Sequence, residues 1–346
     1  MKAMMLTGIR KMEMMEVPEP QIIHADDVKI RMVVVGICGS DIHYFTQGNI
    51  GSQKVDFPLT LGHEGAGVVV ETGPAVTKVR PGDLIAIEPA MPCGECDQCL
   101  AGRSHTCRKI KFLGCPNQAE GCLSEYLVMP EENCFKLPDN LNPDHGSISE
   151  PLAIGVYSVK KAGDIKNLKA GILGFGPIGM SVLLALQAKG AGDIYVTDKI
   201  DERLAIASKE NAVYTGNPMK SNIAEQIRQM EPQGLDIVFE CCGQQEAIDQ
   251  AVDIMKPGGK IIIAGIPEFE RWSLNVENTR RKEIMIQFIR RQVDCTQDAI
   301  DHMHSGQIDV SNMVTHHFPF EWTYEAFELV AGYRDGVMKA MIDISR

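Results

Sequence analysis

From about Leu168 the chain alternates short apolar runs with helix-like stretches, and this alternation restricts the fold more than any other feature. The apolar runs are Gly171–Leu173, Ile194–Thr197, Asp236–Phe239 and Lys260–Ala264. Strands separated by helices favour parallel pairing, because parallel neighbours need a long crossover connection. The pattern therefore predicts a doubly wound parallel sheet in this part of the chain.

The chain before about Pro138 follows a different pattern, in which short apolar runs are divided by turn signals. Val28–Val35, Gly67–Glu71 and Leu84–Ile87 are such runs, and Arg80-Pro81-Gly82-Asp83 is one of the turns. Many short strands with turns are typical of a β-rich barrel or sandwich. We therefore expect an α/β plus β protein of two domains, which also suits a length of 346 residues.

The end of the chain is expected to return to the first domain. After Phe288 the pattern predicts a helix, a strand, a helix and a last strand, in that order: 297–303, 314–318, 324–330 and 338–344. The predicted domains are residues 1–152 with 290–346, and residues 153–289.

Charge and composition limit the partners. The net charge of −12 would repel the phosphates of a nucleic acid. No apolar run approaches the roughly 18 residues of a membrane helix. Residues 1–16 also lack the pattern of a signal peptide. We expect a cytoplasmic protein with neither nucleic acid nor membrane partners.

Four of the eleven cysteines lie close together as C-x2-C-x2-C-x7-C: Cys93, Cys96, Cys99 and Cys107. Thiolates at this spacing favour a closed tetrahedral Zn²⁺ site. The alternative, a disulfide cluster, needs an oxidising compartment and an export signal. The odd number of cysteines also favours reduced thiols, so we interpret the cluster as a structural zinc site. Because a closed site has no open position for substrate, any chemistry would occur elsewhere.

A glycine-rich turn lies between the strand that ends at Leu173 and a helix-like segment that runs to about Lys189. Its sequence is Gly174-Phe175-Gly176-Pro177-Ile178-Gly179. Glycines at this spacing permit a tight turn, close approach of a pyrophosphate and packing of the helix on the strand. The free N–H groups of the helix N-terminus favour a negative charge there. The turn therefore predicts a dinucleotide site.

Asp198 ends the next strand, nineteen residues after Gly179. A carboxylate at this place would accept hydrogen bonds from the adenosine ribose hydroxyls and repel a 2′-phosphate. This favours NAD over NADP, whereas the cations Lys199 and Arg203 follow closely and soften the preference. We expect Asp198 and Arg203 at the cofactor.

Four residues outside the cysteine cluster have side chains suited to a catalytic metal: Cys38, His63, Glu64 and Glu150. A catalytic zinc usually has three protein ligands and an open position. Each residue also has a purely structural interpretation, as a buried cysteine, a surface His-Glu pair or a helix-capping carboxylate. Spacing alone leaves both interpretations open.

Five motifs together resemble a known enzyme family. In chain order they are Cys38-Gly39-Ser40-Asp41-Ile42-His43-Tyr44, Gly62–Gly67, the four-cysteine cluster, Glu150-Pro151-Leu152 and Gly174–Gly179. As a set they are similar to the zinc-dependent medium-chain dehydrogenases, and within these to the sorbitol (polyol) dehydrogenase branch. The similarity covers essentially the whole chain. It implies a GroES-like catalytic domain, a Rossmann coenzyme domain and a homotetramer.

The resemblance also implies roles for the scattered residues. Cys38, His63 and Glu64 would bind the catalytic zinc, and Glu150 would hold a water at the remaining position. We place Glu150 outside the metal's coordination shell, because a second bound carboxylate would make the site anionic and a poorer Lewis acid. Exchange of Glu64 and Glu150 during turnover stays open. Asp41 would orient the His63 imidazole.

The implied reaction is oxidation of a secondary alcohol of a polyol, of the sorbitol or xylitol type, to the ketose with hydride transfer to NAD. The proton would leave through Ser40 and the ribose hydroxyls to His43. Four residues match positions that line the polyol pocket of the family: Tyr44, Ile50, Glu150 and Arg291. Gln292 replaces a tyrosine that is usual in the family, and Arg290 is the alternative to Arg291.

Other functions share parts of this pattern. L-threonine 3-dehydrogenase and 2,3-butanediol dehydrogenase have the same zinc motifs, whereas Tyr44, Ile50 and Val314-Thr315-His316 favour the polyol branch. A protein of another class would be a non-enzymatic module that keeps zinc and nucleotide binding. We expect the enzyme, because loss of catalysis normally removes the metal ligands and all of them are present.

Overall fold

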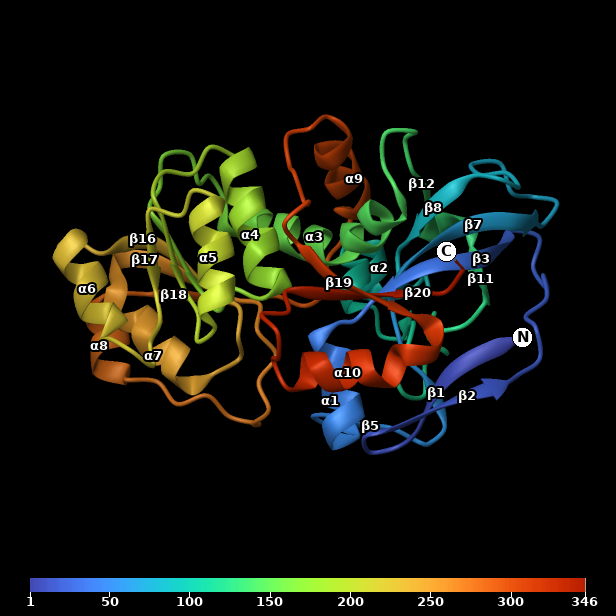
Figure 1. Ribbon diagram of the computed structural model, residues 1–346. Helices are drawn as coiled ribbons and strands as arrows, with labels where there is room; N and C mark the ends of the chain where they lie inside the picture. The colour runs from blue at the N-terminus through green and yellow to red at the C-terminus, as the bar shows by residue number, and fades with distance from the viewer. Residues whose placement is uncertain (346) are drawn as a thin grey trace. The chain divides into compact units, whose positions relative to one another are not determined.

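The computed structural model describes residues 1–345, which pack as two compact units (Figure 1). Unit 1 comprises Met1–Glu150, Thr296–Gly306 and the chain from Val314 onward, and unit 2 comprises Pro151–Cys295 and Gln307–Met313. Residues 151–152, 290–295 and 307–313, expected in the first domain, belong to unit 2. Side-chain hydrogen bonds from Gln307 to the Ala188 carbonyl and from Asn312 to Glu210 hold the last of these segments there. The expected domain limits otherwise stay a prediction.

Unit 1 is rich in β structure. Its elements in chain order are β1 (Lys2–Gly8), β2 (Lys11–Glu16), β3 (Asp27–Gly36), α1 (Gly39–Gln47), β4 (Asn49–Ile50), β5 (Gln53–Lys54), β6 (Leu59–Thr60), β7 (Glu64–Thr72), β8 (Leu84–Ile87), β9 (Ala90–Met91), α2 (Asp97–Leu100), η1 (Ser104–Thr106), β10 (Lys111–Phe112), β11 (Tyr126–Pro130), η2 (Glu131–Asn133), β12 (Cys134–Lys136), α9 (Thr296–His304), β19 (Val314–Pro319), η3 (Phe320–Trp322), α10 (Thr323–Ala331) and β20 (Lys339–Asp343). The helix α3 (Pro143–Ala162) begins in unit 1 and ends in unit 2.

The main sheet of unit 1 has the strand order β12-β8-β7-β3-β20-β19, with β11 paired to β3. The pairs are antiparallel except β19 with β20. The strand β3 is buried along almost its whole length because it has neighbours on both edges and apolar side chains on both faces. A smaller sheet, β2-β1-β6, completes this β-rich unit.

Unit 2 alternates strands and helices as the sequence predicts. Its elements are β13 (Ala170–Leu173), α4 (Pro177–Ala188), β14 (Ile194–Thr197), α5 (Asp201–Lys209), β15 (Tyr214–Gly216), α6 (Ile223–Met230), β16 (Leu235–Glu240), α7 (Gln245–Ile254), β17 (Met255–Ile263), α8 (Val276–Arg281) and β18 (Met285–Phe288). The strands form one parallel sheet in the order β15-β14-β13-β16-β17-β18. The predicted doubly wound sheet is therefore confirmed, and its order reverses between β13 and β16, where such sheets bind nucleotides.

The four elements expected near the end of the chain are present as α9, β19, α10 and β20, within two residues of their predicted limits. The helices α1 and α3 were not predicted as elements. Among the described residues, no helix combines the length and apolar character needed to cross a bilayer.

Candidate functional site

One group of metal-binding side chains forms where β3 ends and β7 begins. The two strands are antiparallel and Gly36 pairs with Glu64, so Cys38 lies close to His63 and Glu64. One ligand atom of each of these three residues lies within 4.8 Å of the others. The structure thus brings together a thiol, an imidazole and a carboxylate, which we call the Cys38 group.

Asp41, in the first turn of α1, links this helix to His63. Its carboxylate accepts hydrogen bonds from the N–H groups of Cys38 (3.1 Å) and Gly62 (3.4 Å). Its Oδ1 also lies 3.4 Å from His63 Nδ1, which leaves Nε2 as the ring nitrogen available to a metal. Burial alone lowers the pKa of His63, but the charges of Asp41 and Cys38 raise it well above its usual value. A cation bound there would replace the proton.

Glu64 has one engaged and one unengaged carboxylate oxygen. Oε2 forms an ion pair with the buried Lys339. Oε1 is buried and has no hydrogen-bond partner within residues 1–345, a costly arrangement unless an ion or water satisfies it. A catalytic zinc ion fits this donor set, because sulfur, nitrogen and oxygen ligands leave a fourth position open. Gly36 makes the arrangement possible, since a Cβ there would clash with Glu64 Oε2.

Glu150 lies on α3 and is buried, but it is outside the group of ligand atoms found among the described residues. Burial raises the pKa of Glu150, and the charges of Glu64 and Glu88 add to this shift, whereas His63 and Lys339 oppose it. Glu150 is therefore in electrostatic contact with the Cys38 group. Its place outside the coordination shell stays a prediction.

The other catalytic and substrate residues expected in unit 1 lie on α1 and β4. Ser40 and His43 are partly buried on α1, and Ile50 is partly buried on β4. Tyr44 is buried, and its hydroxyl lies 3.5 Å from the Cys115 sulfur, either of which can donate. Their roles stay predictions.

Arg291 lies in unit 2, in a turn where its φ is +52°. The neighbouring Gln292, which replaces the tyrosine usual in the family, is buried. Its side-chain oxygen accepts a hydrogen bond of 2.9 Å from the Cys295 N–H. Gln292 therefore stabilises the local turn. The role of Arg291 in binding substrate stays a prediction.

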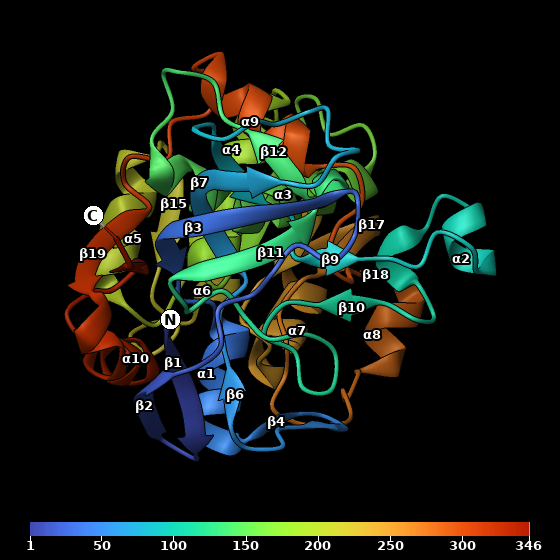
Figure 2. The ribbon, with the colours of Figure 1, turned by 90° about the vertical axis from the view of Figure 1, so that its right-hand side faces the viewer.

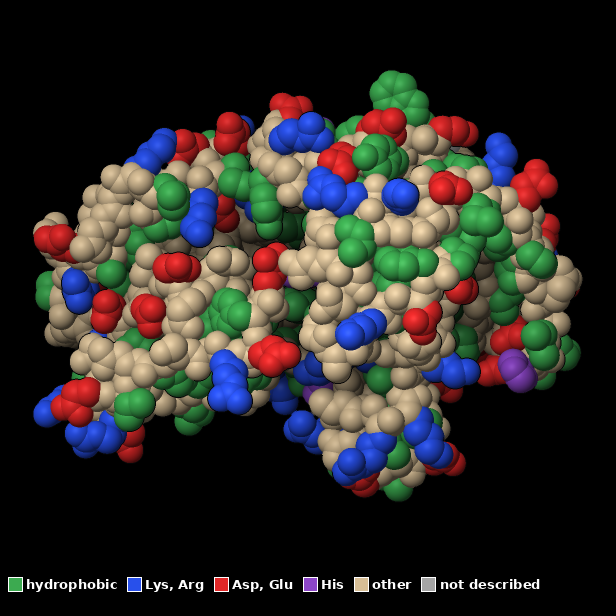
Figure 3. All heavy atoms as spheres, turned by 90° about the horizontal axis from the view of Figure 1, so that it is seen from below, with side chains coloured by type: hydrophobic (Ala, Val, Ile, Leu, Met, Phe, Trp, Pro, Cys, Tyr) green, Lys and Arg blue, Asp and Glu red, His purple; other side chains and the backbone are tan. Residues whose placement is uncertain are grey.

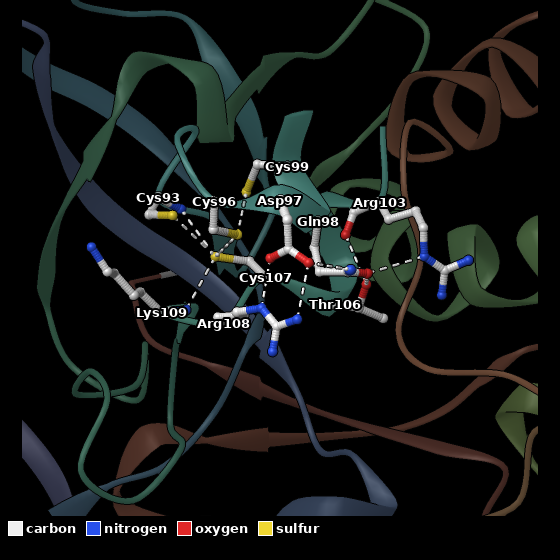
Figure 4. Close-up of polar contacts among 10 residues, drawn as sticks. All are labelled: Cys93, Cys96, Asp97, Gln98, Cys99, Arg103, Thr106, Cys107, Arg108 and Lys109. Carbon is white, nitrogen blue, oxygen red and sulfur yellow. Dashed lines mark hydrogen bonds and ion pairs between the residues drawn. The ribbon is translucent and has the colours of Figure 1, made fainter. Parts of the chain in front are cut away.

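The sulfur atoms of the four-cysteine cluster lie close together, all within 4.8 Å of one another (Figure 4). The sulfur of Cys107 lies 3.5 Å from that of Cys93 and 3.9 Å from that of Cys96, and the sulfurs of Cys96 and Cys99 are 3.6 Å apart. A tetrahedron with Zn–S bonds of about 2.3 Å has edges of about 3.8 Å. The four thiols thus fit a structural zinc ion, and they are not disulfides.

The segment between β9 and β10 that carries these cysteines, residues 92–110, is a lobe that extends from the rest of unit 1 (Figure 2). β9 and β10 pair at its base. Arg108 binds both oxygens of Asp97 at 2.6 and 2.9 Å. The N–H groups of Arg108 and Cys99 lower the pKa of Cys96 to about 6, which favours the thiolate that zinc requires. The lobe has no hydrophobic core cluster of its own among the described residues, so the metal would hold it in shape.

The glycine-rich turn joins β13 to α4 in unit 2. Gly174 has φ +93°, and a Cβ there would clash with Cys242. A Cβ at Gly179 would clash with the Gly174 carbonyl, so this glycine lets the helix pack on the turn. Gly176 is the N-cap of α4, with Pro177 following as the first helical residue. A Cβ at Gly176 would have only the end of Arg203 within 4 Å, so the space before the helix N-terminus can accept a pyrophosphate.

Asp198 and Arg203 lie beside this turn, and their contact with the cofactor stays a prediction. Asp198 Oδ2 accepts a hydrogen bond of 2.6 Å from the Phe175 N–H, and its Oδ1 accepts one of 2.8 Å from the Ile200 N–H. The carboxylate thus joins the glycine turn to the end of β14, and its remaining lone pairs can accept ribose hydroxyls. Arg203 is buried on α5, where its charge suits a phosphate.

Comparison with known proteins assigns both parts of the chain. Residues 24–139 match the alcohol dehydrogenase GroES-like domain, and residues 177–305 match the zinc-binding dehydrogenase family. The chain is 33% identical over 343 residues to a sorbitol dehydrogenase of Bacillus subtilis (strain 168), covering 99% of this chain and 97% of that protein. The chain belongs to the zinc-dependent medium-chain dehydrogenases. As a member of this family it is an oxidoreductase of CH–OH donors that uses zinc and a nicotinamide cofactor, which confirms the enzyme over the non-enzymatic module.

Two solved structures have the same fold. An Escherichia coli oxidoreductase/dehydrogenase of unknown specificity involved in membrane biogenesis superposes with a TM-score of 0.94 at 34% identity, covering 100% of this chain and 99% of that one. A chain described as a zinc-binding dehydrogenase of Sinorhizobium meliloti 1021, bound to NADP, superposes with a TM-score of 0.91 at 28% identity, covering 99% of both. The predicted GroES-like and Rossmann folds are thereby confirmed.

Sequence reasoning missed one residue that contacts the Cys38 group. Lys339 contacts Glu64 from β20. The available signal was a single lysine in the otherwise apolar run Val337–Ile342, because a charge in a buried strand needs a partner.

Proposed function

We propose that this dehydrogenase oxidises a secondary alcohol of a polyol, of the sorbitol or xylitol type, to the ketose with NAD as hydride acceptor. The observation that carries the proposal is the Cys38 group, with its unengaged Glu64 oxygen and the open position that three ligands leave. A zinc ion held there would lower the pKa of the substrate hydroxyl and polarise the carbonyl oxygen of the ketose.

The residues of unit 1 bind and deprotonate the alcohol in this proposal. Ser40 would take up the hydroxyl proton and His43 would receive it, and the ribose hydroxyls that a bound cofactor supplies would lie between the two side chains. Glu150, whose burial and acidic neighbours raise its pKa, holds a water beside the metal ligands. Asp41 keeps the His63 ring in one orientation through its contact with Nδ1.

A carboxylate beside the glycine turn supports NAD as the cofactor. Asp198 is held by two backbone N–H groups, and its negative charge would repel the 2′-phosphate of NADP. Arg203 opposes this preference, because its positive charge is buried close to Gly176 and would attract the 2′-phosphate of NADP. A relative with the same fold is bound to NADP, so the fold does not exclude that cofactor, and we attribute the preference proposed here to the charge of Asp198.

The polyol assignment depends on polar groups that can pair several hydroxyls. Glu150 and Arg291 offer an acceptor and a donor, while Tyr44 and Ile50 would shape the pocket. Such a site rejects alcohols that lack the matching hydroxyls, because its own polar groups would stay unpaired. The Bacillus subtilis relative named sorbitol dehydrogenase supports the same substrate class.

Initial rates over sorbitol, xylitol, L-threonine and 2,3-butanediol, each with NAD and with NADP, test the proposal directly. We expect kcat/KM for a polyol with NAD to exceed that for threonine or butanediol by at least about 100-fold, the discrimination that two or more unpaired polar groups produce. A preference for threonine would instead assign the threonine 3-dehydrogenase activity, and equal rates with NADP would remove the role given to Asp198.

We also propose that the protein acts in the cytoplasm without a nucleic acid partner. Its free thiols suit a reducing compartment. Acidic and basic side chains are interspersed on the face shown in Figure 3, and the net charge is −12. The net negative charge would repel a phosphate backbone.

The expected homotetramer also belongs to the proposal, and β18 supports it. This strand is the last in its sheet and pairs with β17 alone within the described chain. It has no charged residue or proline to protect the edge, and Met285 and Phe288 are 59% and 57% exposed. Two copies of β18 could pair about a twofold axis without charge repulsion.

Substituting Phe288 with lysine is expected to weaken this association by roughly 100-fold or more. Each dimer would lose two apolar contacts worth about 1.5 kcal/mol each. Sedimentation analysis of the variant should show dissociation to smaller species, whereas Ile23→Lys, at a position in unit 1 that is 80% exposed, should not. An unchanged oligomer in the Phe288 variant would remove β18 from the interface.

A further inference from the structure

Lys339 is a charged residue inside an apolar strand. Its side chain is 1% exposed, and its neighbours Met338, Ala340 and Met341 are also buried. Burial of an ammonium group is costly unless it is paired and hydrogen-bonded. The contacts that compensate for this burial therefore indicate what the lysine does.

The ammonium group of Lys339 contacts one proposed metal ligand directly and the residue that precedes another. It forms the ion pair with Glu64 Oε2, and it donates a hydrogen bond of 3.1 Å to the Ile37 carbonyl. Ile37 directly precedes Cys38. A single side chain thus contacts one member of the Cys38 group and the peptide that carries another.

The sheet of unit 1 explains how one lysine reaches both. β20 pairs with β3, with Met341 opposite Gly36 and an Ile37 N–H bond of 3.0 Å to the Ala340 carbonyl. β3 pairs in turn with β7, where Gly36 is opposite Glu64. Lys339 therefore extends across the end of β3 to the start of β7.

We propose that Lys339 is a positioning residue for the metal group, which rests on the function proposed above. By holding Glu64 Oε2, it leaves only Oε1 for the cation, and by holding the Ile37 carbonyl it fixes the direction in which Cys38 leaves β3. Ser147 supports the same geometry, since its hydroxyl donates a hydrogen bond of 2.8 Å to the Glu64 carbonyl. The carboxylate is thereby held as a one-oxygen ligand.

Lys339 also changes the charge of the group. A divalent cation with one thiolate and one carboxylate has no net charge, and the adjacent ammonium makes the assembly positive. Before a cation binds, the ammonium group already lies beside the buried Glu64 carboxylate and compensates for its negative charge. The contacts of Lys339 and its positive charge therefore have the same consequence. Each holds the ligands in place before the metal binds.

Metal affinity in the absence of substrate tests this proposal. In Lys339→Met the affinity of the Cys38 group for Zn²⁺, measured by chelator competition on protein whose lobe keeps its zinc, should fall by about 10- to 100-fold, as for other residues that orient metal ligands. Substituting Co²⁺ at the site should also change the visible spectrum, because the ligand geometry changes. If Lys339→Met fails to fold, Lys339→Gln, which keeps a hydrogen-bond donor but no charge, replaces it and should show a smaller loss of affinity.

A double-mutant cycle separates positioning from a general role in stability. In a Glu64→Gln background the further change Lys339→Met should cost little additional affinity, because the lysine acts through Glu64. Lys29→Met is the matched control, since Lys29 is buried in the same sheet and pairs with Glu19 away from the metal ligands; it should leave the affinity unchanged.

Two results would overturn the inference. In the first, Lys339→Met has a lowered melting temperature, but its affinity for Zn²⁺ and its Co²⁺ spectrum equal those of the unmodified protein. The second is a full additional loss in the Glu64→Gln background. If the unmodified protein itself bound a single zinc per chain, in the lobe, the proposed function would fail and not merely the role of Lys339.

Discussion

Replacing Cys38 with alanine is expected to lower kcat by about 1000-fold or more. The thiolate is one of three ligands in the Cys38 group, and the remaining imidazole and carboxylate would hold a cation poorly. Loss of a metal that stabilises charge in the transition state removes about 4 kcal/mol or more, which corresponds to this factor. Steady-state rates with the preferred polyol, together with metal analysis, measure both consequences.

The metal analysis makes the result specific. The zinc content of Cys38→Ala should fall from two per chain to one, because the lobe binds its ion through four separate cysteines. Cys134→Ala is the matched control, since Cys134 is a buried thiol on β12 that contacts only the Pro130 carbonyl through its sulfur among the described hydrogen bonds. That variant should keep both zinc ions and its activity. Retained turnover in Cys38→Ala would refute the catalytic assignment.

The fold could be predicted where local pattern and tertiary packing agree. Unit 2 buries its strands on both faces, so each strand appears in the sequence as an apolar run, and β13, β14 and β16 were located to within about a residue. The helix α1 was not located, because Gly39–Gln47 has a mixed composition and its N-cap is Cys38, whereas the usual N-cap residues are Ser, Thr, Asp and Asn. The helix α3 continues through Pro151, a residue that usually ends a helix.

The metal group could not be derived from spacing, because its geometry depends on pairing between distant strands. Cys38 and Glu64 are brought together by the register of β3 and β7, in which Gly36 is opposite Glu64. These residues were located through the resemblance of whole motifs to a known family. The members of a family share a tertiary structure, so such a resemblance carries information about distant pairings. Lys339 was missed for the same reason, because its partner lies 275 positions away.

The four-cysteine cluster is the opposite case, since its spacing alone predicted its geometry. Its ligands lie within one lobe, so no distant pairing is needed to bring the four sulfurs within 4.8 Å of one another. Such a local site is easy to recognise but says little about the reaction. The residues that we propose for chemistry lie elsewhere in unit 1.

Changing Cys96 and Cys99 together to serine is expected to cost stability and not the chemical step. Binding of a structural zinc contributes on the order of 10 kcal/mol to the folding of small zinc domains, and within the described residues the lobe has no hydrophobic core cluster of its own. We expect the melting temperature to fall by roughly 10 °C, rapid proteolysis within residues 92–110 and a weaker oligomer. Calorimetry, limited proteolysis and sedimentation measure these effects.

Comparing the loss of stability, of zinc and of hydride transfer in this variant shows which metal site is structural and which is catalytic. Leu100→Ser is the matched control, because Leu100 is 77% exposed in the same lobe and is not a ligand; it should keep both zinc ions and the melting temperature. In the double serine variant, the molecules that stay folded should keep their second zinc ion, and hydride transfer in a single turnover should be within about threefold of normal. Normal stability and assembly with a specific loss of hydride transfer would instead assign the chemistry to the lobe and leave the Cys38 group as a structural site.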